Sequence, residues 1–509
     1  MRHARRLWLA ALAALLVAGC AGSSEASSAD PGGKRPKPLP AVATTVPPLP
    51  ATDGGVLRVA VDDLGSFDPL AVNIGSASNL LVADLIFDGL TDVLPGELEA
   101  SPAIASGWSA NNDLDVWTFD LDPERTFANG EPITVDDVVF SLDRARKSFA
   151  LIWQSLTVIE SVEAVDDVTV RIRLGQPTAG LAELLAAPSA GILPEDLVTA
   201  DAAAFASQPV GSGPFGRVET TADGVTLSAT TEDVRLDAVE VIDADSADEA
   251  WELHQQGEVD MAVIPEGEPS TDEVVETPFR ALLFLGINVN HPSLRSPSVR
   301  RAVVASVDSA DVTELVLGDR AEPADGVGVS ADACGPLCEQ EPVAGAELVA
   351  ALEDDVPVLH VDHRDDPMEK ELADAVVADL RAAGFEAEAR SHAAAEYSEF
   401  LVSGDQEIFR FGHVGVAPVG DAYLPLMFGS EAQNNVMGFG STDLDQAMVD
   451  AATRGTWDEL EREIMTDAAP VIPLARYVSR WAVSEHVSGL EIDRDGTFDP
   501  TSVAVSEAE

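Results

Sequence analysis

Residues 117–144 read Trp-Thr-Phe-Asp-Leu-Asp-Pro-Glu-Arg-Thr-Phe-Ala-Asn-Gly-Glu-Pro-Ile-Thr-Val-Asp-Asp-Val-Val-Phe-Ser-Leu-Asp-Arg, and they decide the fold. The wider segment 108–121 alternates polar and apolar residues in two runs separated by Asn-Asn-Asp, which predicts a β-hairpin. A helix is expected from Val135 toward Arg146, because two aspartates follow Val135 and carboxylates in a first turn stabilise the helix dipole. The stretch therefore predicts the second strand of a hairpin, followed by a helix.

Strand and helix patterns continue on both sides of this stretch. Residues 56–61 alternate as a strand, residues 79–90 place leucine and alanine at helical spacing, and residues 158–165 and 168–174 form a strand pair turned by Asp-Asp. No repeat of fixed period and no heptad pattern occurs. The chain is long enough for two or three domains of about 100–200 residues each. This mixture predicts an α/β body of several domains.

The amino terminus reads as a targeting segment. Three arginines precede an apolar run over residues 7–17, which is shorter than the roughly 20 residues that span a bilayer. The run ends in Leu-Val-Ala-Gly-Cys at Cys20, which resembles a bacterial lipobox and implies removal of residues 1–19 and a lipid on Cys20. The alternative is an ordinary secretory signal followed by an unrelated cysteine. Residues 20–53, rich in Ser and Pro, are expected to form a flexible tether.

The composition limits the possible partners. The chain carries 89 acidic and 30 basic residues, a net charge of −59, which argues against nucleic acid and anionic membrane surfaces because both repel such a field. Lysine is nearly absent after the tether, where Lys147 and Lys370 remain. Adaptation to salt and a compositional bias of the lineage both explain this. With 46% hydrophobic residues, the chain has ample material for large cores.

Two cysteines remain once Cys20 is assigned to the lipid. Cys334 and Cys338 close a short Gly-Pro loop, and outside the membrane a local disulfide is the favoured interpretation. A metal site is the alternative, although no neighbouring histidine supplies further ligands.

The opening stretch resembles the signature of the dipeptide, oligopeptide and nickel class of bacterial extracellular solute-binding proteins, family 5. In that family the segment forms a strand, a turn and a helix opened by Asp-Val. Further similar motifs follow in family order at Pro209–Phe215, Gly257–Asp260, Asn288–Asn290, Val299–Ala302, Ser306–Asp308, Gly384–Glu388, Asn434–Phe439, Asp443–Asp445 and Pro470–Pro473. Each motif is weak by itself, but the ordered set runs from about residue 56 to 498.

The resemblance implies an α/β, two-lobed periplasmic-binding-protein fold of the larger three-domain type, with the ligand in a cleft between lobes. Closure is then a hinge motion around the ligand. The expected divisions are residues 54–87, 209–287 and 484–509 for lobe I, 88–208 for an additional domain of lobe I, and 288–483 for lobe II.

The resemblance also implies which residues contact the ligand. By family position they are Phe67 and Phe215 from lobe I, and Phe411, His413, Asn434 and Asn435 from lobe II. Trp481, in the alternating strand 474–483, is a further candidate that either stacks on the ligand or seals the lobe. The alternative for the aromatic residues is a place in the core, and for the two asparagines a cap on a turn.

One segment departs from the family pattern. His413 stands where a tryptophan is usual, and residues 414–416 offer none of the carboxylate that peptide-binding members use for the ligand's α-ammonium. Asp421 matches a later, structural aspartate. The departure implies a blocked or non-peptide ligand, or a different anchor for the amine.

The sequence contains little that points to catalysis. Residues 211–216 satisfy Gly-x-Gly-x-x-Gly, but Pro214 and the polar strand after it favour a turn over a dinucleotide site. His360 and His363 would lie on opposite faces of a strand, which favours surface histidines over a metal pair. Neither His-Glu-x-x-His nor Gly-x-Ser-x-Gly nor a Walker A motif occurs. We expect no enzyme, cofactor or metal.

Together these features predict the substrate-binding lipoprotein of an ABC importer. We expect a monomer, anchored on the outer face of the cell membrane, that captures a peptide or peptide-like solute and delivers it to a permease. The alternative is a ligand-poor sensory or envelope-interaction lipoprotein on the same fold.

Overall fold

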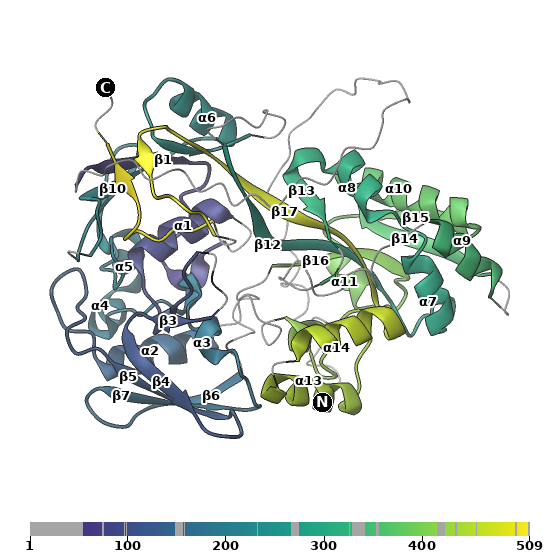
Figure 1. The fold of residues 1–509 in the computed structure, drawn as a ribbon, viewed down its shortest axis with the longest axis horizontal. Helices are drawn as coiled ribbons and strands as arrows, with labels where there is room; N and C mark the ends of the chain where they lie inside the picture. The colour runs from purple at the N-terminus through teal and green to yellow at the C-terminus, as the bar shows by residue number, and fades with distance from the viewer. Residues whose placement is uncertain are drawn as a thin grey trace.

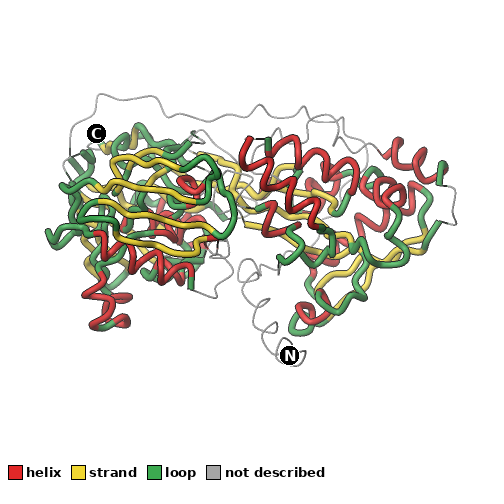
Figure 2. Tube along the Cα trace, turned by 90° about the horizontal axis from the view of Figure 1, so that it is seen from below, coloured by secondary structure: helices red, strands yellow, loops and turns green. Residues whose placement is uncertain are grey.

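The computed structural model describes residues 54–73, 76–95, 97, 99–147, 156, 158–231, 233–265, 274–324, 326–327, 342–352, 356–414, 423–432, 435–454, 456–493 and 496–506. These residues form two bodies joined by two long strands that cross the middle of the molecule (Figure 1). Figure 2 shows the same two bodies from below, with helices lying over strands in the second body. The predicted α/β, two-lobed architecture is confirmed.

The stretch quoted first folds as predicted, within an additional sheet of the first body. Strands β4 (Ala105–Ala110) and β5 (Val116–Leu121) form the hairpin, and the sheet order is β4-β5-β7-β6 with β6 (Ile159–Ala164) and β7 (Thr169–Leu174). Helix α2 (Val135–Arg146) starts at a capping box, in which Thr134 and Asp137 satisfy each other's backbone N–H groups. Its Val138, Leu142 and Ala145, at helical spacing, pack into the core beneath the sheet.

Parallel strands build the first body's main sheet. Strand β1 (Val56–Val61) lies parallel to both β10 (Ala238–Asp243) and β11 (Met261–Val263), and β9 (Gly224–Ser228) and β8 (Arg217–Thr220) continue the sheet. Helix α1 (Ala77–Ile86) packs against this sheet. The other elements of this body are β2 (Thr91–Asp92), β3 (Ser101–Pro102), β18 (Val487–Ser488), β19 (Ala504–Val505), η3 (Pro69–Ala71), η5 (Pro188–Ala190), α3 (Leu181–Leu184), α4 (Glu195–Ala200), α5 (Ala202–Ser207) and α6 (Ala247–Gln255).

Helix α1 ends four residues before the sequence pattern predicted, at Ile86 rather than residue 90. The chain turns away there because a close approach of backbones requires it. A Cβ on Gly89 would lie 2.1 Å from the carbonyl oxygen of Leu185, and one on Gly211 would lie 2.0 Å from that of Ile86. The Gly-x-Gly-x-x-Gly motif is therefore a tight turn packed on the end of α1, closed by a hydrogen bond from Gly211 N to Gly216 O (2.8 Å).

The second body is built around another set of parallel strands. Strand β14 (Val358–Arg364) lies parallel to β15 (Glu386–His392) and to β16 (Ile408–Val414). The sheet has a separate apolar cluster on each face. The other elements of the second body are η6 (Gly318–Arg320), β13 (Ala321–Pro323), α7 (Pro297–Val304), α8 (Ser309–Val316), α9 (Pro342–Ala350), α10 (Pro367–Ala383), α11 (Tyr397–Leu401), α12 (Leu424–Phe428), α13 (Thr442–Arg454), α14 (Trp457–Glu463) and η9 (Ile464–Ala468).

Strands β12 (Val274–Ile287) and β17 (Val471–Val483) belong to both bodies. Val275 and Trp481 pack into the core of the first body, whereas Leu283 and Leu474 pack into that of the second. The predicted lobe boundaries fall at the carboxyl ends of these two strands. The division of the cores instead supports placing the boundary within each strand, and we propose that position.

Candidate functional site

Both sets of parallel strands point their carboxyl ends at the middle of β12 and β17. In the first body β11 ends at Val263, which pairs with Trp481, and β1 ends beside it. In the second body β16 ends at Val414, which pairs with Ala281 in the middle of β12. Ligands of open α/β sheets bind outside the carboxyl ends of the strands. The region around the middle of β12 and β17, here called the interlobe region, is therefore the candidate site.

The burial of β17 changes at this position. The strand is buried from Val471 to Arg476 and again from Arg480 to Val483, but residues 477–479 between them are partly exposed. The pairing with β12 is also irregular here, because the register shifts between Pro278 and Leu282. The strand is thus accessible only at its middle, beside the irregular pairing, where it passes from one body to the other.

Tyr477 lies at the centre of this accessible stretch. Its side chain packs against the core of the second body and also against a small apolar cluster of Val72, Leu80 and Ala83 in the first body. Ala281 on β12 contacts the same cluster. Among the described residues, no hydrogen bond to the Tyr477 hydroxyl group is found. The ring therefore contacts both bodies at a partly exposed position.

A charged cluster holds the ends of β14 and β16. Arg364 donates from its backbone N and from Nε to the carboxylate of Glu369, at 2.9 and 2.7 Å, and Arg410 Nε forms an ion pair with the same carboxylate at 3.1 Å. Glu369 is 1% exposed. Burial lowers the pKa of Arg364, but the hydrogen bond and the charge of Glu369 outweigh it and raise that pKa. The cluster fixes the strand that leads toward residues 415–422.

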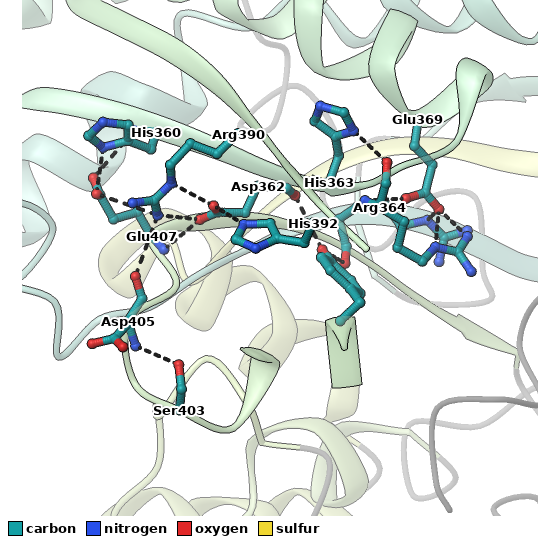
Figure 3. Close-up of polar contacts among 12 residues, drawn as sticks. His360, Asp362, His363, Arg364, Glu369, Arg390, His392, Ser403, Asp405 and Glu407 are labelled. Carbon is teal, nitrogen blue, oxygen red and sulfur yellow. Dashed lines mark hydrogen bonds and ion pairs between the residues drawn. The ribbon is translucent and has the colours of Figure 1, made fainter. Parts of the chain in front are cut away.

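A second polar network lies farther back along the same face of β14, around Asp362 (Figure 3). Asp362, with no exposed surface, accepts two hydrogen bonds from Arg390 (2.7 and 2.8 Å), one from the backbone N of Glu407 (3.2 Å), and lies 2.8 Å from Nε2 of His392. Glu407 in turn lies 2.7 Å from Nδ1 of His360. A buried carboxylate needs such partners, because an unpaired buried charge is costly. The network ties β14, β15 and the start of β16 together.

The side chain of Tyr397 joins this network to the strands. Its hydroxyl group donates toward the backbone carbonyls of Asp362 (3.2 Å) and Arg410 (2.9 Å). Burial, and then the charge of Glu369, raise the pKa of Tyr397, so the phenol stays protonated as a donor. The sheet around the candidate site is thus held by buried polar contacts as well as by apolar packing.

Three of the aromatic residues predicted to contact ligand lie in the core. Phe215 and Trp481 have no exposed surface and Phe67 has 9%, all three in the apolar cluster of the first body. In this structure Phe215 and Trp481 therefore present no surface to a ligand. Phe411 is partly exposed, and its ring packs edge-on against Phe284 at a centroid distance of 5.6 Å.

The remaining predicted residues divide into two groups. Asn435 caps a turn, since its amide donates to Gly429 O (3.1 Å) and Phe439 O (2.6 Å) and its oxygen accepts from Phe439 N (3.1 Å). His413 pairs through its backbone with Leu282, while its side chain lies outside the described residues. Also outside the described residues are Asn434, Asp421, Cys20, Cys334, Cys338 and the segments 1–19 and 20–53.

The prediction that both histidines of β14 are surface residues was wrong for His363, which is only 3% exposed and lies 2.6 Å through Nδ1 from Arg364 O. The burial follows from the alternation of the strand, which turns His363 with Val361 toward the apolar cluster. Within the described part of the chain, no group of three or more His, Cys, Asp or Glu side chains is arranged to hold a metal ion.

The reading of the sequence missed Tyr477, Arg364, Glu369 and Arg410. Tyr477 lies among mixed polar and apolar residues, Arg476, Val478, Ser479 and Arg480, and two of these, both arginines, are buried, so the sequence does not indicate which of them is exposed. Arg364 could have been found, because it ends an apolar strand just before a helix that begins at Pro367, and strand ends of this kind carry functional residues in α/β folds.

The comparison with protein families gives one match over much of the chain. Residues 99–435 match the model of the bacterial extracellular solute-binding proteins, family 5 Middle, which is more than half of the chain. Dipeptide-binding protein DppE of Bacillus subtilis is 23% identical over 462 residues, covering 80% of this chain and 84% of DppE. Probable di/tripeptide-binding protein 5 of Pseudomonas aeruginosa is 24% identical over 503 residues, covering 86% of this chain and 93% of that protein.

Solved structures share the fold over nearly the whole described chain. The murein tripeptide-binding protein MppA in an unliganded open form superposes with a TM-score of 0.76 at 19% identity, covering 89% of this chain and 98% of MppA. DppA of Helicobacter pylori in complex with the peptide STSA superposes with a TM-score of 0.66 at 20% identity. OppA of Haemophilus influenzae in complex with RPPGFSPFR superposes with a TM-score of 0.64 at 18% identity. Each of these two covers 89% of this chain and 99% of the other.

Proposed function

The chain belongs to the bacterial extracellular solute-binding proteins of family 5, and from this membership we propose that it is the substrate-binding lipoprotein of an ABC importer. It captures a peptide or peptide-like solute in the interlobe region and delivers it to a membrane permease. The names of the two curated relatives, a dipeptide-binding and a probable di/tripeptide-binding protein, support peptides as the solute class. The proposal includes no catalytic step.

One observation carries the proposal most directly. The carboxyl ends of two separate sets of parallel strands face the same stretch of β12 and β17, and that stretch is the part of β17 that is accessible. A ligand held there contacts both bodies, so its binding energy favours their closure. Tyr477, with its ring against both bodies at a partly exposed position, is the residue we assign to the floor of this site.

The arrangement of the two bodies supports a ligand-free, open state. The structure superposes better on the unliganded open form of MppA, with a TM-score of 0.76, than on the two peptide complexes, with scores of 0.66 and 0.64. Closure then requires bending at β12 and β17, where the chain passes between bodies. Hinges of this kind absorb the change at a few residues.

The same proposal places the protein outside the cytoplasm as a monomer. Residues 1–19 direct export, Cys20 carries the lipid and residues 20–53 tether the body. Among the residues that the structure describes, no helix is long and apolar enough to cross a membrane. With a net charge of −59, the chain is repelled by anionic headgroups, and a tether lets the folded body stand clear of them.

The ligand contacts that we propose in the second body come from β16 and from the turn between α12 and α13. Phe411, His413, Asn434 and Asn435 remain our proposed contacts from the sequence, whereas Phe67, Phe215 and Trp481 are better explained as packing. Because residues 414–416 contain no carboxylate, we propose that the ligand's amine is blocked or is held by another group.

A thermal-shift experiment on the purified full-length protein tests the proposal. The panel contains free-amine peptides, the same peptides N-acetylated, sugars and nickel chelates, each at low and high salt. We expect peptides to raise the melting temperature. An effect that survives acetylation indicates a ligand with a blocked amine, and an effect that acetylation abolishes indicates that another group holds the amine. No shift with any compound would contradict the proposal and favour the ligand-poor sensory or envelope-interaction lipoprotein.

A further inference from the structure

Two arginines of β17 lie on either side of the accessible stretch, and both are buried against exposed carboxylates. The side chains of Arg476 and Arg480 are 7% and 6% exposed, whereas those of Glu322, Glu276 and Asp319 are 43%, 39% and 47% exposed. A buried guanidinium group needs a partner, because an uncompensated buried charge is costly. Each arginine is therefore held by carboxylates at the surface of the strand pair.

The two arginines differ in whether their carboxylate partners lie in one body or in both. Arg476 donates to Glu322 at 3.2 Å, and these residues are direct neighbours in the pairing of β13 with β17. Both lie on the second body's side of the register shift. This ion pair stays within one body, whatever the angle between the bodies.

Arg480 instead joins the two bodies. It lies on the first body's side of the register shift, where it is the direct neighbour of Glu276 on β12 and donates to it from Nε at 3.1 Å. Its Nη1 donates to Asp319 at 3.0 Å. Asp319 lies in η6, which follows Leu317 in the core of the second body and leads directly into β13. The contact between Arg480 and Asp319 therefore crosses the hinge.

We infer that the Arg480–Asp319 ion pair is a latch that holds the open arrangement and must break when the bodies close. Bending between Pro278 and Leu282 moves η6 and β13 relative to Arg480, while Glu276 moves with Arg480. The guanidinium group keeps one partner throughout, so opening the latch leaves no unpaired buried charge. The latch sets the resting ratio of closed to open molecules, and thereby the apparent affinity for ligand. This role rests on the proposed function for the open and closed arrangements and for that last step.

The test measures the arrangement of the bodies without any ligand. Spin labels are attached through an azide-bearing amino acid at Glu240 in β10 and Asp374 in α10, which are 43% and 53% exposed and lie in different bodies. Distances are measured in the detergent-solubilised full chain carrying Asp319→Asn. We expect the ratio of closed to open molecules to rise by up to roughly five-fold, the upper end of the range for a partly exposed ion pair.

The chain offers a matched control. Glu322→Gln removes a carboxylate of similar exposure that pairs with an arginine of the same strand, but within one body, and it should leave the distances unchanged. Asp319→Glu keeps the carboxylate, and its distances should match those of the wild type rather than those of Asp319→Asn. Arg480→Lys should behave like Asp319→Asn, because an ammonium group lacks the planar fork that reaches two carboxylates. Unchanged distances in Asp319→Asn, or equal shifts in Glu322→Gln, would overturn the latch. Neither result depends on whether the protein binds peptides.

Discussion

Arg144 and Asp68 join the additional sheet of the first body to the loop that follows β1. The guanidinium group of Arg144, in the last turn of α2, donates to both carboxylate oxygens of Asp68, at 2.8 and 2.5 Å. Asp68 also accepts from the backbone N of Leu70 at 3.0 Å and so caps η3, the short helix before α1. One bidentate pair thus fixes the segment that approaches the interlobe region.

Replacing Arg144 should destabilise the fold in a pH-dependent way. Burial raises the pKa of Asp68, but the hydrogen bonds and charge of Arg144 and the N–H of Leu70 outweigh it and lower that pKa below 3.8. The stabilisation is therefore present above pH 3.8 and is lost as the pH falls through the lowered pKa. Arg144→Gln should cost about 1–3 kcal/mol at pH 7, measured by urea unfolding.

The control for this variant lies on the same helix. Arg146 pairs with Asp143 only three residues away, at 2.5 Å and with similar exposure of both side chains. Arg146→Gln should cost at most about 0.5 kcal/mol, because pairs within one helix contribute little. Equal losses of unfolding free energy in the two variants would mean that the bidentate contact with Asp68 stabilises the fold no more than a pair within one helix.

Titration of Asp88 should make the protein more stable at pH 5 than at pH 7. Burial raises the pKa of Asp88 to about 6, although Arg125 opposes the shift. A carboxyl group with a raised pKa stabilises the fold most below its ordinary value of 3.8, and this contribution is lost as the pH rises through 6. Lowering the pH from 7 to 5 should therefore stabilise the protein by about 1 kcal/mol through this group.

The variant Asp88→Asn isolates this contribution from the other acidic groups. Its stability should change less than that of the wild type between pH 7 and pH 5, when both are measured by urea unfolding. Because every other carboxylate is common to the two proteins, their contributions cancel in the difference. Identical pH profiles would show that Asp88 does not titrate in this range.

Asp362 should be the most sensitive polar position in the second body. It is fully buried and receives Arg390 through two hydrogen bonds. Asp362→Asn removes the charge but keeps the shape, and it leaves the guanidinium group of Arg390 with less compensation. The expected loss is about 3 kcal/mol of unfolding free energy. Asp374→Asn, on an exposed i,i+4 pair with Lys370, should change stability little. A small effect at Asp362 would contradict the importance of the network.

Tyr477 should affect ligand binding more than stability. Tyr477→Phe removes only the hydroxyl group and should weaken ligand binding by several-fold, about 1 kcal/mol for one hydrogen bond, in a calorimetric titration. The matched control is Tyr423→Phe, since the hydroxyl group of Tyr423 is buried and donates to Glu461 at 2.6 Å. That variant should lose stability and keep its affinity. The opposite pattern would remove Tyr477 from the proposed site.

The local elements were predictable because short-range patterns determine them. Alternation and turn residues predicted the hairpin of β4 and β5, and carboxylates in the first turn predicted the helix after Thr134. The end of α1 was not predictable in this way. It depends on Gly89 and Gly211, which admit backbone segments that are distant in the sequence.

The candidate site was less predictable than the fold, for a physical reason. Whether an aromatic residue lines a site or fills a core depends on which strands lie beside it. Phe215 matches a family position and Trp481 lies in an alternating strand, yet both are fully buried in the apolar core of the first body. Tyr477 is accessible because β12 and β17 pass between two cores at that point, which no window of sequence reveals.

The most direct test of the central claim is native mass spectrometry of the purified full-length protein, followed by denaturing release of any small molecule that co-purifies. The proposed function predicts a mass increase that disappears on denaturation and peptides in the released fraction. A protein that carries no small molecule, and that binds none after incubation with a peptide mixture at low or high salt, would contradict peptide capture.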